Sequence, residues 1–126
     1  MRRLLIANRG EIARRIIRTA HAMGIGTVAV YSDADSQALH VQEATVAHAL
    51  QGNASADTYL RIDKLLAAAA ATGADAVHPG YGFLSENEAF AKRCEDEGIA
   101  FIGPRHFSIA AMGDKIASKK LANEAK

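Results

Sequence analysis

The sequence has too few cysteines for an internal disulfide bond, since Cys94 is the only one. It also lacks an excess of charge of one sign. The formal net charge is +1, which gives no argument for a nucleic-acid partner or an anionic membrane. No apolar stretch reaches the length of a membrane span, and the short run at residues 4–7 ends too soon for a signal peptide. We therefore expect a protein of a reducing compartment with neither nucleic acid nor membrane as its partner.

The composition is typical of a globular domain. Hydrophobic residues make up 49% and charged residues 23% of the 126 positions, close to the average for folded domains. This length corresponds to one domain and allows roughly two thirds of the unfolded surface to be buried. An ordinary hydrophobic core is therefore expected.

Short apolar segments alternate with segments of helical periodicity. Strands are predicted at residues 4–7, 27–31, 46–50, 74–77 and 99–102. Helices are predicted at residues 10–23, 39–44, 59–72, 86–97 and 107–112. The alternation predicts an α/β fold with a doubly wound, mainly parallel sheet of about five strands.

The last residues continue a helical pattern. Residues 116–126 have apolar side chains at helical spacing, and no Gly or Pro follows them as a stop. We expect the chain to be a piece of a longer protein. The alternative is a natural C-terminal helix.

Polar or glycine-containing segments follow four of the predicted strands. They lie at residues 8–10, 32–33, 79–82 and 103–104. In an open parallel sheet the carboxyl ends of the strands lie along one edge, and ligands bind there. The sequence therefore predicts a ligand site at this edge.

The loop at residues 78–87 (HPGYGFLSEN) is the most distinctive of these segments. Pro79, Gly80 and Gly82 impose backbone geometries that few other residues adopt. Ser85, with Glu86 just after it, is interpreted as the N-cap of the following helix. Such a shaped loop often has a function, and the alternative is an ordinary tight turn.

Other candidate site residues are weaker. Residues 8–11 stand where a dinucleotide fingerprint would stand, but only Gly10 is present there, so NAD binding is rejected. Asp33 or Asp35 follows the second predicted strand, as a ribose-binding acid does, and a helix-capping role is favoured instead.

The histidines and the cysteine are interpreted as structural. No histidine pair has metal-ligand spacing with a nearby Cys or carboxylate, so no metal ligand is assigned. His78 precedes Pro79 and is expected to order the loop. Cys94 has apolar neighbours at helical spacing and is expected to be a buried thiol.

Charged residues cluster on the first predicted helix. Glu11 is placed to pair with Arg14 or Arg15 at helical spacing. These residues and Arg18 form either a solvated face or a contact surface.

Several segments together resemble a known family. They are residues 6–13 (IANRGEIA), 30–35 (VYSDAD), 78–87, 101–104 (FIGP) and 112–115 (MGDK). Their order and spacing are similar to the N-terminal domain of the biotin carboxylase component of biotin-dependent carboxylases, over residues 3–122. Residues 112–122 look most like the biotin-containing subunits of acyl-CoA carboxylases, propionyl-CoA carboxylase in particular.

The resemblance implies a Rossmann-like domain at residues 1–114, with residues 115–126 starting the connection to an ATP-grasp domain. It implies an ATP-dependent ligase that uses bicarbonate to carboxylate biotin on a carrier domain, with Mg²⁺ or Mn²⁺. The implied partners are the ATP-grasp and C-terminal domains of the same chain, the biotin carboxyl carrier domain and a carboxyltransferase subunit. The implied location is the cytoplasm, or the mitochondrial matrix in a eukaryote.

The resemblance also implies site residues. Lys115 contacts ATP phosphates, Tyr81 and Gly82 form a wall of the biotin pocket, and Glu86 lies close by. No catalytic or metal-binding residue is assigned within the chain, so the chain alone is expected to be inactive.

In some free-standing family members, arginines that match Arg15 and Arg18 lie near a subunit interface. A carboxylate one turn later completes that contact there, and Ala22 occupies this position here. This difference argues against the same mode of dimerisation.

Two other functions remain open from the sequence. One is a stand-alone nucleotide-binding or regulatory module with the same fold. The other is a response-regulator-like domain, which is disfavoured because that fold needs acids where Asn8 and Arg9 follow the first predicted strand.

Overall fold

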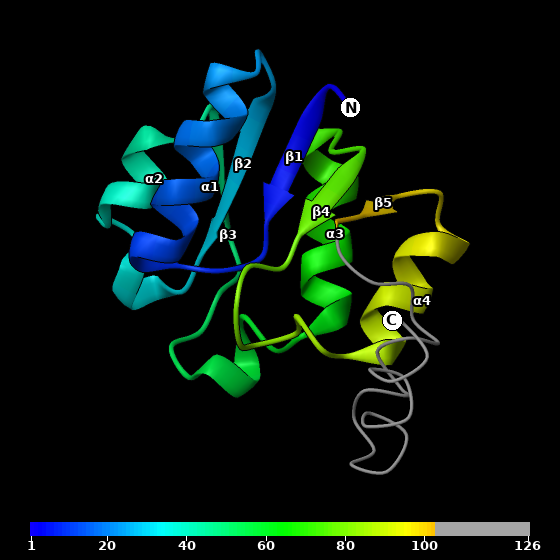
Figure 1. Cartoon of the computed structure of the whole chain (residues 1–126). Helices are drawn as coiled ribbons and strands as arrows, with labels where there is room; N and C mark the ends of the chain where they lie inside the picture. Colours follow the sequence, from blue (N-terminus) through cyan, green and yellow to red (C-terminus); the bar gives the residue numbers. More distant parts are fainter. Residues whose placement is uncertain (103–126) are drawn as a thin grey trace, which may run out of the picture.

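The computed structural model describes residues 1–102, which form a five-stranded parallel sheet covered by helices on both faces (Figure 1). The strands are β1 (Arg3–Ile6), β2 (Gly26–Tyr31), β3 (Val46–Ala49), β4 (Ala76–His78) and β5 (Ala100–Phe101). Their order across the sheet is β3-β2-β1-β4-β5, and every neighbouring pair is parallel. The predicted doubly wound fold is confirmed.

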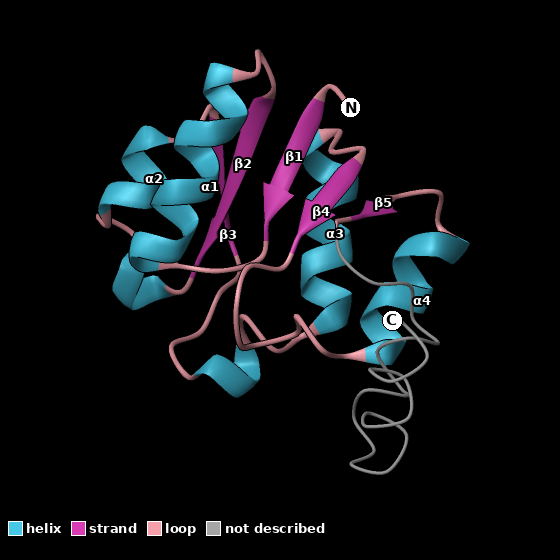
Figure 2. Cartoon of the chain, in the orientation of Figure 1, coloured by secondary structure: helices cyan, strands magenta, loops and turns pink. Residues whose placement is uncertain are grey.

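Four α-helices and two short 3-10 helices connect the strands (Figure 2). The α-helices are α1 (Gly10–Ala22), α2 (Leu39–Glu43), α3 (Ile62–Thr72) and α4 (Glu88–Asp96). The 3-10 helices are η1 (Asp33–Asp35) and η2 (Ser55–Asp57). The helices predicted at 107–112 and 116–126, and the domain boundary after residue 114, lie outside the described residues.

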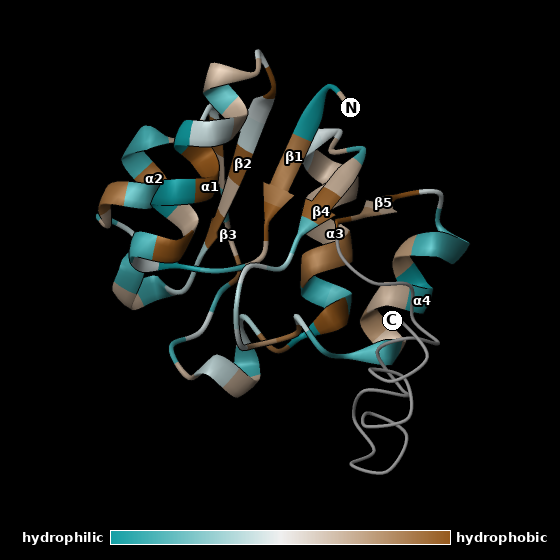
Figure 3. Cartoon of the chain, viewed as in Figure 1, coloured by the Kyte–Doolittle hydropathy of each residue, from teal (hydrophilic) through white to brown (hydrophobic). Residues whose placement is uncertain are grey.

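The central strand β1 serves both layers of the core. Leu4 and Ile6 pack with the buried face of α1, whereas Leu5 packs with side chains of α3 and α4. This division follows from the two-residue period of a strand. Hydropathy colouring shows apolar strands at the centre and hydrophilic outer surfaces on the helices (Figure 3). Both faces of the sheet are therefore buried, as a parallel sheet requires.

The start of α4 differs from the prediction. Asn87, not Ser85, is the N-cap, and its side-chain oxygen accepts a hydrogen bond of 2.9 Å from the backbone N–H of Phe90. Ser85 lies in a turn, where its N–H donates to the carbonyl of Gly82. Phe83 has a positive φ of 43°, which is not a helical angle, and the turn extends over residues 83–86. Glu86 therefore precedes the helix.

Helix α3 also begins later than predicted, at Ile62. Residues 55–61 form η2 and a following turn, in which the N–H of Arg61 donates to the carbonyl of Thr58. Tyr59 is buried in this turn. Its contacts to other segments, rather than helical periodicity, determine its place.

Cys94 is fully buried, as predicted. Burial raises the pKa of its thiol to about 11, so the thiol is protonated at neutral pH. Among residues 1–102, no helix combines the length and apolarity needed to cross a bilayer.

The turn after β4 packs closely against the residue that follows β1. The side-chain amide of Asn8 donates to the carbonyl of Pro79 at 2.9 Å and to that of Tyr81 at 2.7 Å. Gly80 has a φ of +68°, and a Cβ atom there would lie 2.7 Å from Nδ2 of Asn8 and 2.9 Å from a methyl carbon of Ile12. Both the backbone angle and the space therefore require glycine at this position.

His78 orders the same turn, which confirms its predicted structural role. Its Nδ1 atom accepts a hydrogen bond of 3.0 Å from the N–H of Gly80. This contact requires an unprotonated Nδ1, and burial lowers the pKa of His78 below its ordinary value. The neutral ring with its proton on Nε2 therefore matches the turn.

We expect Gly80→Ala to lower the free energy of unfolding by more than about 2 kcal/mol, because steric overlap adds to backbone strain. The matched control is Gly98→Ala, since Gly98 has a φ of +73° and no atom of residues 1–102 lies within 4 Å of the place where its Cβ would stand. The control should lose about 1–2 kcal/mol from the backbone angle alone. Urea unfolding of the 126-residue chain measures both values. Equal losses would show that the contact with Asn8 is not close.

We also expect the free energy of unfolding to fall as the pH drops below 6.5. Burial lowers the pKa of His40 and of His78 from an ordinary value of 6.5. The folded state thus binds fewer protons than the unfolded state, so stability is complete above 6.5 and declines below it. Asp35, whose pKa is lowered from 3.8, contributes a similar loss only in a lower pH window.

Variants at two histidines test this expectation. Within the described residues, Nδ1 of buried His40 has no hydrogen-bond partner, while Nε2 lies 3.3 Å from the carbonyl of Val30. His40→Gln keeps a donor for that carbonyl and should flatten the pH dependence between about 7.5 and 5.5. His48→Gln, at a less buried position on β3, is the control. If His40→Gln leaves the slope of the free energy of unfolding against pH unchanged, His40 is not the source of that slope.

Candidate functional site

The carboxyl ends of β1, β2 and β4 lie side by side, because β1 pairs with both of the others (Figure 1). The segments that follow them are residues 8–10, 32–35 and 79–87. This is the edge at which the sequence predicts a ligand site. Residues 103–104, the fourth predicted segment, lie outside the described residues.

A polar network joins the first two segments. The guanidinium of Arg9 donates from Nε to Oδ2 of Asp35 at 2.6 Å and from Nη2 to Oδ1 at 2.7 Å. The hydroxyl of Tyr59 donates to Oδ2 of Asp35 at 2.6 Å and accepts from the N–H of Ser32 at 3.1 Å. Asp35 is therefore held by two donors from different parts of the chain.

These contacts shift the pKa of two groups. The hydrogen bond from Arg9 holds the pKa of Asp35 well below its usual range, with a further lowering by Tyr59. Burial raises the pKa of Tyr59, and the neighbouring Asp35 carboxylate adds to this effect. At neutral pH the network thus consists of a carboxylate, a guanidinium and a neutral phenol.

The roles predicted for the two acids after β2 are wrong. Asp35 lies within η1, and its carboxylate binds Arg9 and Tyr59 rather than capping a helix. Asp33 also lies in η1, and its carboxylate accepts from the N–H of Gly52 at 3.2 Å. Contacts with distant segments of the chain, rather than helix capping, therefore determine where the two carboxylates lie.

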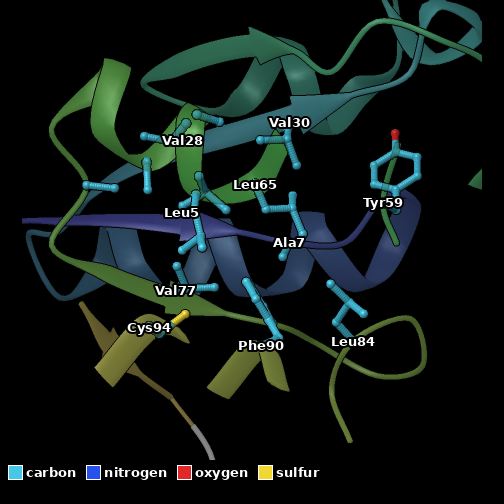
Figure 4. Packing of buried hydrophobic residues seen from close by; sticks show 14 of the residues in the cluster. Leu5, Ala7, Val28, Val30, Tyr59, Leu65, Val77, Leu84, Phe90 and Cys94 are labelled. Atoms are coloured by element: carbon cyan, nitrogen blue, oxygen red, sulfur yellow. The ribbon is translucent and has the colours of Figure 1, made fainter. Parts of the chain in front are cut away.

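An aromatic pair connects this network to the loop after β4. The rings of Tyr59 and Phe83 are stacked, with centroids 5.2 Å apart and planes inclined by 26°. In the core close-up, Tyr59 and Leu84 flank the same apolar cluster as Phe90 (Figure 4). The loop is therefore attached to the core by its residues 83 and 84.

Three of the predicted site residues lie together on this loop. Tyr81 is 77% exposed, and Glu86 is also exposed, before the first residue of α4. Gly82 has a φ of +69°, and no atom of the described part of the chain lies within 4 Å of where its Cβ would stand. Lys115, the fourth, lies outside the described residues.

A groove of about 1020 Å³ runs beside α1. Its lining includes Arg15 and Arg18 of α1, with His78 and Tyr81 near the loop after β4. Arg14 does not line the groove and reaches α2, where it pairs with Glu43 at 2.7 Å; it also pairs at 2.6 Å with Glu11, which Arg18 approaches at 3.7 Å. The charged face of α1 is thus partly a bridge between two helices, not simply a solvated face.

Sequence reasoning misses Asn8 and Tyr59 as positioning residues. Asn8 stands at a strand end within a segment that resembles the family, but no spacing indicates that its amide reaches residues 79 and 81. Periodicity assigns Tyr59 to a helix. Its burial beside Asp35 depends on the fold of residues 32–59.

Tyr81 presents an exposed aromatic ring at this edge, next to a glycine with open space around it among the described residues. Among residues 1–102, no three side chains of His, Cys, Asp or Glu are grouped as a metal ion would require.

The sequence matches the family model described as biotin carboxylase, N-terminal domain, over residues 1–109. A propionyl-CoA carboxylase alpha chain from Ruegeria pomeroyi is 61% identical over 123 residues, covering 98% of this chain and 18% of that protein. Biotin carboxylase 1 from Bacillus subtilis is 50% identical over 125 residues, covering 99% of this chain and 28% of that protein.

Solved structures are similar over the same extent. The urea carboxylase of Kluyveromyces lactis has a TM-score of 0.95 at 51% identity, covering 98% of this chain and 11% of that one. The biotin carboxylase domain of a thermophilic 2-oxoglutarate carboxylase bound to bicarbonate has a TM-score of 0.92 at 48% identity, covering 98% and 28%. The chain thus spans about a fifth of the length of the Ruegeria pomeroyi protein. It belongs to the family of biotin carboxylase N-terminal domains.

Proposed function

We propose that this chain is the N-terminal domain of an ATP-dependent biotin carboxylase that works within an acyl-CoA carboxylase, with propionyl-CoA as the favoured acceptor. The observation that carries the proposal is the family match over residues 1–109. The 61% identity to a propionyl-CoA carboxylase alpha chain supports the choice of acceptor. The whole enzyme would use ATP and bicarbonate to carboxylate biotin on a carrier domain.

In this proposal the domain supplies one wall of the biotin site. The exposed ring of Tyr81 offers a flat face and a polar tip to a ureido ring. Gly82 lets its backbone approach the ligand closely, because it has no side chain and nothing in residues 1–102 stands within 4 Å of where its Cβ would be. Glu86, which is exposed on the same loop, is proposed to lie close to the biotin site.

The other proposed groups lie beyond residue 102. Lys115 is proposed to contact ATP phosphates, for which a compact ammonium with three donors is suited. Mg²⁺ or Mn²⁺ is proposed to be held by an ATP-grasp domain, as the family membership implies. A carrier domain and a carboxyltransferase subunit are the proposed partners, in the cytoplasm or the mitochondrial matrix.

A stand-alone nucleotide-binding or regulatory module is not favoured, because the relatives are carboxylase chains several times longer. ATP titration distinguishes the two functions. A regulatory module would bind ATP without a second domain.

We expect Tyr81→Ala, in the full-length enzyme, to raise the KM for biotin by at least about fivefold, since a lost aromatic contact costs about 1 kcal/mol. The KM for ATP should stay the same. Tyr81→Phe keeps the flat face and is the control. Steady-state kinetics with biotin and ATP varied separately give both constants, and a change in ATP use alone would contradict the assignment.

Lys115→Ala should have the opposite effect. Loss of a charge-assisted phosphate contact costs about 1.5–3 kcal/mol, so the KM for ATP should rise at least about tenfold with biotin use nearly unchanged. Lys119→Ala serves as the control for loss of a nearby positive charge. If Lys115→Ala shifts only the KM for biotin, Lys115 is not the phosphate contact.

The 126-residue chain alone should not cleave ATP in a bicarbonate-dependent manner with free biotin. The physical reason is that neither a phosphate lid nor a metal site is assigned to its residues. Phosphate release above background, measured with the purified chain, would overturn this expectation.

A further inference from the structure

We infer that Tyr59 is a positioning residue, which fixes Tyr81 by holding Phe83 from the core side of the loop. The residues concerned are Arg9, Asp35, Tyr59 and Phe83, called here the Tyr59 clamp. The consequence for biotin rests on the proposed function. The effect on the loop itself does not.

The clamp begins with a ring that cannot turn freely. Tyr59 is 2% exposed, and its hydroxyl makes two hydrogen bonds, to Asp35 at 2.6 Å and from Ser32 at 3.1 Å. Asp35 is itself held by two donors of Arg9. Three segments, after β1, after β2 and before α3, therefore determine where the plane of this ring lies.

Phe83 stacks on that plane in an unusual backbone conformation. Its φ is 43°, in a region that residues other than glycine seldom adopt. Such a conformation persists only where the surroundings hold it. The stacking on Tyr59, at 5.2 Å between centroids, together with burial against the core cluster, is the contact that holds it.

Tyr81 lies between two anchors. On one side Asn8 binds the carbonyls of Pro79 and Tyr81 itself, and on the other Phe83 is fixed by Tyr59. Within residues 1–102, no hydrogen bond or ring contact holds the side chain of Tyr81, which is 77% exposed. The direction of its side chain is therefore set by the backbone at residues 79–83.

A purely structural role for Tyr59, as one more core aromatic, makes a different prediction. In that case Tyr59 and Phe83 would affect stability but not the loop in particular. A second aromatic pair in the same core, Phe90 with Phe101 at 5.8 Å, provides the comparison. Phe101 lies on β5 and not on the loop.

The experiment uses the full-length enzyme with three substitutions: Tyr59→Phe, Phe83→Leu and, as control, Phe101→Leu. Tyr59→Phe keeps the ring and removes its two hydrogen bonds. Phe83→Leu keeps an apolar side chain and removes the stacking. Hydrogen exchange is followed at the amides of Ser85 and Asn87, which donate to the carbonyls of Gly82 and Leu84.

Both clamp variants should speed exchange at these two amides by about tenfold or more, because a loosened loop opens more often. Both should raise the KM for biotin by about threefold or more, with the KM for ATP unchanged. Phe101→Leu should lower the melting temperature about as much as the two clamp variants do. It should leave the exchange rates of the loop amides and the KM for biotin unchanged.

The inference is overturned if the loop amides exchange no faster in either clamp variant than in Phe101→Leu. It is also overturned if the loop loosens while the KM for biotin stays constant, provided that Tyr81→Ala raises that KM. If Tyr81→Ala has no effect on biotin, the proposed role of Tyr81 in the biotin site fails instead. The exchange rates then still decide whether Tyr59 holds the loop. Should Tyr59→Phe fail to fold, Phe83→Leu alone decides.

Discussion

The geometry at the carboxyl edge of the sheet, where the sequence predicts a ligand site, depends on one buried amide group. Asn8 is 2% exposed, and its Nδ2 atom donates to two carbonyls of the loop after β4 while its Oδ1 atom accepts from the N–H of Arg9. Because both loop partners are acceptors, the position needs a donor with two hydrogens. A carboxylate of the same size would face two carbonyls with no hydrogen to share. The end of β1 and the loop after β4 are thus joined by chemistry that few side chains supply.

The contact between Arg9 and Asp35 contributes orientation more than stability. Half of the Arg9 side chain is exposed, at 50%, whereas that of Asp35 is 10% exposed. An ion pair so open to water adds at most about 1 kcal/mol. Its two parallel hydrogen bonds, however, fix the carboxylate in one plane. Tyr59 donates to that carboxylate, so the contact with Arg9 also helps to fix the position of the buried Tyr59 ring.

The sequence is sufficient for the elements that depend on periodicity. Strand β1 and helix α1 match their predictions to within one residue at each end, because apolar spacing alone determines which face is buried. The exposed position of Tyr81 also follows from a loop at a strand end, whereas Glu86, predicted as the first residue of a helix, lies in the turn before α4. The placement of Lys115 in the site stays a prediction.

The features that could not be predicted depend on long-range contacts. The cap at Asn87 depends on how many residues the preceding turn uses, which the positive φ of Phe83 decides. That angle is in turn stabilised by Tyr59, 24 positions earlier in the chain. Asp is a residue type favoured at helix caps, and only the fold brings Arg9 and Tyr59 into contact with Asp35. Local propensity is outweighed at each of these positions by a tertiary partner.

An exposed aromatic side chain is ordinary by itself, and Tyr81 is distinguished by its supports. The carbonyls of Tyr81 and Pro79 accept hydrogen bonds from the buried amide of Asn8, and Phe83 stacks on Tyr59 in the turn before α3. Ordering a loop in this way costs conformational entropy, and the ring, which is 77% exposed, gains little packing from it within residues 1–102. In the proposed function, the exposed ring forms a wall for a planar ligand. The entropy cost of ordering the loop is then met before the ligand binds, so it does not reduce the affinity.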